Sequence, residues 1–203
     1  MRREKIEWCQ MYWYDTDCPE LPRVLLIGDS IVVGERDLLA EALRGRATVG
    51  AFSTSKIVGD PAFTRELDFA LGDYPPDLIV FNNGLHGRDY DDEFYRRGLE
   101  GALDHLRGML AVPMLWRNST PITVAGHPEQ FHSRDNALVL RRNRIAAEVV
   151  AARGIPAIDL YTPMTAHPEY SRRDGYHYTA EGYAAQVAIL APRILEALGI
   201  ACP

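Results

Sequence analysis

A serine follows the first strongly apolar run of the sequence, in a setting that suits a nucleophile. The run Val24–Ile27 is succeeded by Gly28-Asp29-Ser30, and a helical pattern begins soon after it. The glycines at 28 and 34 fit neither the dinucleotide fingerprint Gly-x-Gly-x-x-Gly nor the phosphate loop Gly-x-x-x-x-Gly-Lys. What remains is a hydroxyl at the start of a helix, where backbone N–H groups can stabilise the oxyanion of a tetrahedral adduct. Ser30 is therefore the candidate nucleophile.

A serine nucleophile needs a general base, because its hydroxyl reacts weakly at neutral pH. Among six histidines, His177 stands three residues after Asp174, in a glycine-containing turn just before the last helical pattern. A carboxylate at that spacing can take the Nδ1 proton of the imidazole and direct Nε2 toward a serine. Asp-x-x-His is a weak motif by itself, but it occurs once in the chain and follows the last apolar run. We therefore predict Asp174 and His177 to be the partners of Ser30.

A third polar block, Asn82-Asn83-Gly84-Leu85-His86-Gly87, follows the apolar run Leu78–Phe81. Asn83 and His86 can both donate hydrogen bonds to a developing oxyanion. Asn82 is more typical of a turn that caps the end of a strand. The block indicates an oxyanion hole beside Ser30.

Five short apolar runs alternate with longer helical patterns, which predicts an α/β fold. We expect a three-layer α/β/α domain with a flavodoxin-like, five-stranded parallel sheet and helices on both faces. Ligands of such sheets bind outside the carboxyl ends of the strands, so the three polar blocks should meet at one edge. The apolar runs are Val24–Ile27, Ala47–Phe52, Leu78–Phe81, Pro113–Trp116 and Ala157–Leu160, and the helical patterns cover about 35–44, 61–71, 91–109, 135–153 and 180–198.

Residues 1–22 differ from the rest, because four aromatic side chains crowd between Trp8 and Tyr14. We predict an N-terminal aromatic strap over a single domain formed by residues 23–203. Aromatic side chains this dense could also form a substrate-pocket wall or a contact in a homodimer. The cysteines at 9, 18 and 202 form no Cys-x-x-Cys motif, and pairing of Cys9 with Cys18 stays open.

Composition excludes several classes of function. The 203 residues contain 22 Lys and Arg against 28 Asp and Glu, a net charge of −6 that argues against a nucleic-acid partner. No apolar run approaches the roughly 20 residues of a membrane span, and none follows the charged start as a secretory signal would, so we expect a cytoplasmic protein without a membrane partner. His127 and His132 lack a recognised metal spacing, and we expect neither metal nor other cofactor.

Together, Gly28-Asp29-Ser30, the block 82–87 and Asp174-x-x-His177 resemble the SGNH/GDSL hydrolase family over about residues 23–198. The block 82–87, with Trp116-Arg117 leading into the Thr120-Pro121 turn, also resembles a bacterial subset related to the PC-esterase group. The resemblance implies that Ser30 is the nucleophile, His177 the general base and acid, and Asp174 its orienter. The Ser30 backbone N–H would be one oxyanion donor.

The chain departs from the family pattern at the oxyanion hole. Gly84-Leu85-His86-Gly87 replaces the usual Gly-x-Asn-Asp, so either His86 or the neighbouring Asn83 would supply the side-chain donor. A further donor normally comes from a glycine after the second strand, where Gly59 or the backbone of residues 53–55 could serve. We also predict substrate contacts for Asp29 and Arg117 at this edge of the sheet.

The expected function is that of a metal-free serine esterase that hydrolyses a small acyl ester through an acyl-enzyme. The resemblance implies an acetyl group on a carbohydrate as substrate. One alternative is a carbohydrate O-acyltransferase that uses the same three residues. The other is a catalytically silent binding module on a hydrolase scaffold, since a fold does not guarantee activity.

Overall fold

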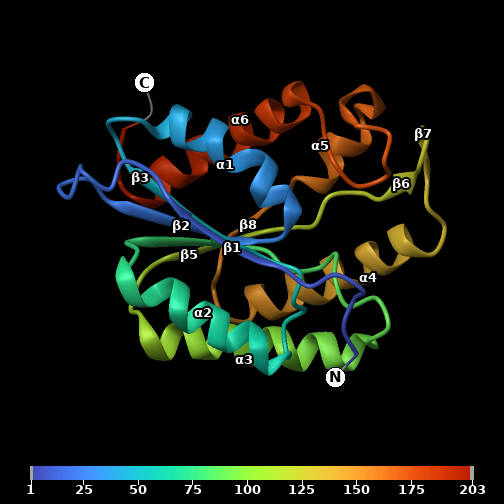
Figure 1. Cartoon of the computed structure of the whole chain (residues 1–203), viewed down its shortest axis with the longest axis horizontal. Helices are drawn as coiled ribbons and strands as arrows, with labels where there is room; N and C mark the ends of the chain where they lie inside the picture. Colours follow the sequence, from blue (N-terminus) through green and yellow to red (C-terminus); the bar gives the residue numbers. More distant parts are fainter. Residues whose placement is uncertain (1, 202–203) are drawn as a thin grey trace.

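The computed structural model describes residues 2–201, which form a sheet between two layers of helices (Figure 1). Within this part of the chain, five parallel strands lie in the order β3-β2-β4-β5-β8, the flavodoxin-like order in which the first strand lies beside the second and third. The predicted α/β fold with a mainly parallel sheet is confirmed. The strands are β2 (Arg23–Gly28), β3 (Thr48–Thr54), β4 (Leu78–Phe81), β5 (Met114–Arg117) and β8 (Ala157–Ile158).

A sixth strand, β1 (Cys9–Trp13), pairs antiparallel with β3 at the edge of the sheet. Its Trp13 lies opposite Gly50, where an added Cβ would come within 2.5 Å of the indole ring. The aromatic segment before residue 23 therefore contributes a strand, while the division of the chain at residue 22 stays a prediction. Cys9 and Cys18 are both free, and Cys202 lies outside the described residues.

Each face of the sheet is covered by its own helices (Figure 1). Leu26 and Val80 pack with α1 (Ser30–Leu43) and α6 (Ala180–Ala197) on one face. Leu25 and Ile79 alternate with them and pack on the other face, because successive side chains of a strand point to opposite sides. The helices of that face are α2 (Pro61–Asp73), α3 (Asp92–Met109) and α4 (Asp135–Ala151).

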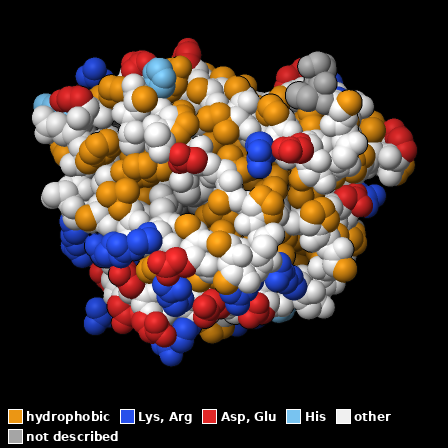
Figure 2. Space-filling model, turned by 180° about the vertical axis from the view of Figure 1, so that it is seen from behind, with side chains coloured by type: hydrophobic (Ala, Val, Ile, Leu, Met, Phe, Trp, Pro, Cys, Tyr) orange, Lys and Arg blue, Asp and Glu red, His pale blue; other side chains and the backbone are white. Residues whose placement is uncertain are grey.

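The layer of α2–α4 carries a charged outer surface. Figure 2 shows Lys, Arg, Asp and Glu side chains gathered along the lower edge, at the level of these helices in Figure 1. The ion pairs Arg96–Glu148 and Arg153–Asp104 each join α3 to α4 or to the turn that follows it. Within residues 2–201, no helix is both long and apolar enough to cross a membrane.

Helices α1 and α6 approach each other closely at Gly34. A Cβ at this position would lie 2.0 Å from the ring of Tyr183 on α6, so any larger residue would force the ring or one of the helices to move. Tyr183 is 7% exposed and packs with Ile31 of the first turn of α1. The contact fixes the start of α1 against the start of α6.

Helix α1 is also tied to the sheet by a buried ion pair. Arg117 at the end of β5 donates a hydrogen bond to the Glu35 carboxylate, and these side chains are 2% and 0% exposed. Burial raises the pKa of Glu35 to about 7, although the Arg117 guanidinium acts in the opposite direction. Glu35 Oε1 and Arg117 Nε have no hydrogen-bond partner among the described residues, so each charge depends strongly on the other.

Removing Arg117 alone should therefore destabilise the fold. We expect Arg117→Met to lower the free energy of unfolding by about 3–5 kcal/mol, because Glu35 is left buried without its counter-charge. In the native chain the folded pKa of Glu35 exceeds its usual 4.5, so stability falls as pH rises through about 7. Without Arg117 this fall should extend to higher pH, and the deficit in urea denaturation should grow between about pH 6 and pH 9.

The matched control replaces both partners. Arg117→Met combined with Glu35→Leu removes the orphaned charge and should recover most of the stability. A double variant as unstable as Arg117→Met at every pH would show that packing at position 117 matters and the charge pair does not.

Candidate active site

Ser30, His177 and Asp174 form one hydrogen-bonded chain. Ser30 Oγ lies 2.8 Å from His177 Nε2, and His177 Nδ1 lies 2.8 Å from Asp174 Oδ2. With the proton on Nδ1, the ring donates to the carboxylate and accepts from the hydroxyl, as in a Ser-His-Asp triad. The structure thus brings together all three residues that the sequence predicts for catalysis, across 147 positions of the chain.

The Asp174 carboxylate shapes its own turn as well as orienting the imidazole. Its Oδ1 accepts hydrogen bonds from the backbone N–H groups of Tyr176 and His177, both at 2.8 Å. Burial alone would raise the pKa of Asp174, but these N–H groups and the His177 ring outweigh it and lower the pKa below its usual value. The carboxylate is therefore kept in the charged form that orients His177.

The turn that carries Asp174 is supported by the hairpin of β6 (Thr123–Val124) and β7 (His127–Phe131). Thr123 N donates to Gly175 O at 3.0 Å, and Gly126 N donates to Arg173 O at 2.8 Å. Gly175 has φ of +94°, and a Cβ there would lie 2.7 Å from Thr123 O. Glycine is thus required both by the backbone conformation and by the closeness of the hairpin.

Ser30 enters the site as the first residue of α1. Asp29 caps this helix, because its Oδ1 accepts a hydrogen bond of 2.9 Å from Ile31 N. The other oxygen of Asp29 is buried and has no partner among the described residues. The Ser30 backbone N–H therefore belongs to the first turn of a helix, whose N–H groups have no acceptor within the helix.

A cavity of about 420 Å³ opens in front of the Ser30 hydroxyl. This volume lies within the range of small-molecule sites. Trp8 lines it, so one aromatic side chain of the N-terminal segment does form a wall of the pocket. The lining residues are Trp8, Gln10, Ser30, Val33, Leu85, His86, Arg88, Tyr176 and His177.

His86 faces this cavity and is held by the N-terminal segment. Its Nδ1 lies 2.9 Å from Glu4 Oε1, and its ring packs edge-on against Trp8 at 6.0 Å. Burial opposes protonation, but Glu4 and the charge of Asp29 outweigh burial and raise the pKa of His86. The hydrogen bond with His86 in turn lowers the pKa of Glu4.

Arg142 of α4 fixes the loop that carries His86. Its guanidinium is fully buried and donates to the carbonyl oxygens of Gly84, His86 and Gly87 at 3.0, 2.5 and 2.7 Å. The ring of Tyr95 lies 5.0 Å from the guanidinium carbon. Three carbonyls from one short loop thus share a single rigid donor.

Asn83 and Gly59 are not brought to the Ser30 cavity. Asn83 is buried, with Oδ1 accepting from Val58 N at 3.1 Å and Nδ2 donating to Lys56 O at 2.8 Å. Gly59 lies against α3, where a Cβ would come within 3.1 Å of the Phe94 ring. Both residues shape the loop after β3, and His86 is the side chain of the predicted oxyanion set that lines the cavity.

Asp29 and Arg117 do not line the cavity either. Both are 2% exposed, because Asp29 caps α1 and Arg117 pairs with Glu35. Their contacts hold α1, whose first residue is Ser30. Neither side chain is in position to contact a substrate in this cavity. Within residues 2–201, no three His, Cys, Asp or Glu side chains are grouped so as to hold a metal ion.

Sequence reasoning missed Glu4 and Arg142, and no motif marks either residue. Glu4 reaches the site only because β1 pairs with β3, a contact between distant segments. Arg142 lies on a helix whose charged residues resemble those of any solvated face, and only its burial reveals its role.

Several proteins of known structure are similar to this chain. A structure of an acetyl xylan esterase is 16% identical with a TM-score of 0.68, covering 85% of this chain and 99% of that one. A lipase/acylhydrolase from Enterococcus faecalis is 23% identical with a TM-score of 0.63, covering 86% and 95%. A GDSL-like lipase from Bacteroides thetaiotaomicron VPI-5482 is 19% identical with a TM-score of 0.65, covering 91% and 96%. At these identities the likeness establishes the fold.

A search of curated proteins found no relative that matches the chain. The model of the GDSL-like Lipase/Acylhydrolase family, in contrast, matches residues 26–185. The proposed kinship with the PC-esterase-related subset stays a prediction. Because the match covers most of the chain, including Ser30 and His177, the protein belongs to the GDSL-like lipase/acylhydrolase (SGNH) family, a family of serine esterases.

Proposed function

We propose that this acylhydrolase cleaves a small acyl ester, an acetyl ester of a carbohydrate above all, with Ser30, His177 and Asp174 as its catalytic triad. The observation that carries the proposal is the pair of 2.8 Å hydrogen bonds that link the three side chains. The same geometry speaks against a silent binding module, which would not require the serine and histidine to be in contact.

The reaction follows from the positions of the protons. Ser30 Oγ attacks the carbonyl carbon while its proton passes to His177 Nε2. The tetrahedral adduct collapses when His177 gives that proton to the leaving alcohol, and the acyl group remains on Ser30. Water then attacks the acyl-enzyme, gives a proton to His177, and the acid leaves as Ser30 recovers its hydrogen. Asp174 stays charged throughout and stabilises the imidazolium.

The oxyanion has two donors in this proposal. The backbone N–H of Ser30 belongs to the first turn of α1, where the helix dipole also favours negative charge. The ring of His86 supplies the second, because it lines the same cavity as Ser30. Asn83 is not needed for this role, since its amide already holds the loop after β3.

The walls of the cavity support a small acyl group and a polar alcohol. Trp8, Val33 and Leu85 offer apolar surface, while Gln10 and Arg88 can form hydrogen bonds to hydroxyl groups. One structural relative is described as an acetyl xylan esterase, which is consistent with an O-acetylated carbohydrate. Product analysis with and without an added glycan acceptor would distinguish hydrolysis from acyl transfer.

The nucleophile can be tested by covalent labelling. A fluorophosphonate probe should modify Ser30, as mapped by mass spectrometry. We expect Ser30→Ala to abolish labelling and to reduce the hydrolysis of p-nitrophenyl acetate by at least about 10³-fold, because no nucleophile remains. Ser133→Ala, which alters an exposed serine, should keep both. Labelling at another residue, or full turnover by Ser30→Ala, would refute the assignment.

The orienting role of Asp174 has its own test. Asn in its place keeps an oxygen for the N–H groups of Tyr176 and His177, but its NH2 group can only donate to His177 Nδ1. The ring then carries its proton on Nε2 and cannot accept from Ser30. We expect Asp174→Asn to lower kcat/KM by about 10²–10⁴-fold, with the melting temperature little changed. A loss below threefold would contradict the role.

A further inference from the structure

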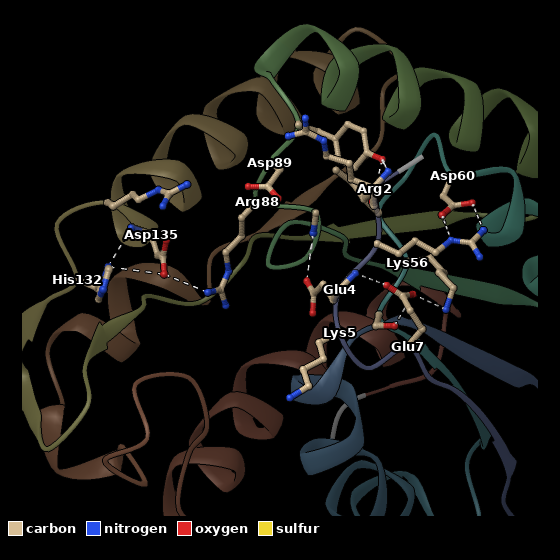
Figure 3. A pocket seen from close by; sticks show the side chains of 16 residues that line it. Arg2, Glu4, Lys5, Glu7, Lys56, Asp60, Arg88, Asp89, His132 and Asp135 are labelled. Atoms are coloured by element: carbon tan, nitrogen blue, oxygen red, sulfur yellow. Dashed lines mark hydrogen bonds and ion pairs between the residues drawn. The ribbon is translucent and has the colours of Figure 1, made fainter.

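The N-terminal segment, residues 2–8, brings a carboxylate to His86, which lines the Ser30 cavity. Glu4 Oε1 contacts His86 Nδ1 at 2.9 Å and Gly87 N at 3.4 Å. Figure 3 shows Glu4 between Arg88 and Glu7. These residues line a charged cleft of about 520 Å³, and Arg88 also lines the Ser30 cavity. A carboxylate therefore contacts the histidine ring that lines the Ser30 cavity.

Glu4 does not depend on His86 for its position. Arg3 donates two hydrogen bonds to the Asp60 carboxylate at 2.9 and 3.0 Å, and Lys56 Nζ lies 2.7 Å from Glu7 Oε2. These anchors flank Glu4 on both sides in sequence, and Figure 3 labels Glu7 and Lys56 of the second one. The segment thus holds the carboxylate against the imidazole with ion pairs of its own.

The hydrogen bond to Glu4 determines what His86 can do at its other nitrogen. A carboxylate only accepts, so Nδ1 of His86 carries a hydrogen in this contact. In a neutral imidazole the other nitrogen is then an acceptor and would repel an oxyanion. His86 can donate from Nε2 only as the imidazolium, with hydrogens on both nitrogens.

The charges around His86 favour the imidazolium. Glu4 on the N-terminal segment and Asp29 at the start of α1 are negative, whereas Arg88 on the following loop is positive and opposes protonation. His177 lines the same cavity as His86. Glu4 is the one of these groups that contacts the ring, and its hydrogen bond favours protonation of His86 more than the charge of Asp29 or of Glu4 itself does.

We propose that Glu4 is a positioning residue that keeps His86 as an imidazolium, so that Nε2–H stabilises the oxyanion formed when Ser30 attacks the ester. This inference rests on the proposed function. It makes the N-terminal segment a part of the active site, and it replaces the neutral amide donor of the family pattern with a charged donor. Charge-assisted donors form the stronger hydrogen bonds.

The pH dependence of the reaction follows from this arrangement. Catalysis needs His177 without its extra proton and His86 with it, so kcat/KM should pass through a maximum. The decrease of kcat/KM at high pH, the alkaline limb, reflects loss of a proton from the His86 imidazolium, whose pKa is raised above its usual value. Removing the Glu4 charge should move this limb to lower pH by about one unit, the lower end of the effect of an adjacent opposite charge.

The experiment compares Glu4→Gln with Glu20→Gln in the hydrolysis of p-nitrophenyl acetate from pH 5 to 9.5. Glu4→Gln should shift the alkaline limb down by about one pH unit, whereas Glu20→Gln removes an exposed carboxylate outside both cavities and should leave the limb in place. His86→Gln keeps a neutral donor close to Nε2, so it should lose the alkaline limb. Adding Glu4→Gln to His86→Gln should then change nothing further.

Titration of the His86 ring by NMR gives a readout independent of turnover. Its pKa should fall in Glu4→Gln and stay unchanged in Glu20→Gln. The proposal is overturned if the limb of Glu4→Gln stays at the native pH, if Glu20→Gln moves it equally, or if the NMR pKa falls while the limb does not. Absence of probe labelling at Ser30 in the native protein would instead refute the proposed function itself.

Discussion

The hydrogen bond between Ser30 Oγ and His177 Nε2 is the interaction on which the rest of the active site depends. It joins two residues 147 positions apart, so its 2.8 Å length reflects the placement of whole elements. Ser30 is fixed by the first turn of α1, by the Asp29 cap and by the buried Glu35–Arg117 pair. His177 is fixed by the turn that Asp174 organises. The Ser30 hydroxyl can be activated only if the groups that position Ser30 and those that position His177 are both in place.

Buried and half-buried polar groups provide most of this support. Arg142 satisfies three carbonyls of the loop at 84–87, and the hairpin of β6 and β7 bonds to the backbone on both sides of Asp174. Such contacts are directional and costly to leave unmade, so they select one conformation more sharply than apolar packing does. The apolar clusters on the two faces of the sheet stabilise the layers. The polar contacts decide where the loops lie.

The sequence predicts those parts of the protein whose signals are local. Ser30 lies in a short motif directly after β2, and Asp174 and His177 share another in the connection between β8 and α6. Parallel strands bring such connections to one edge of the sheet. The five parallel strands can be recognised in the sequence because they are buried and apolar on both faces. Strand β1, Cys-Gln-Met-Tyr-Trp, lies at a half-exposed edge and lacks that pattern. Asn83 and Gly59 were assigned to the oxyanion hole, but the spacing of residues does not encode direction. The Asn83 side chain turns to the loop after β3, and Gly59 of that loop lies against α3. Glu4 depends on the pairing of β1 with β3, and its partner His86 lies 82 positions further along the chain.

Because α1 and α6 approach closely at Gly34, this small residue couples the position of Ser30 to the position of His177. Helix α1 begins with the nucleophile, and α6 begins three residues after the base. Any side chain at position 34 would press on Tyr183 and act as a wedge between these helices. The displacement would be transmitted to the gap between Ser30 and His177, so a single methyl group on α1 would disengage the base without touching a reacting atom.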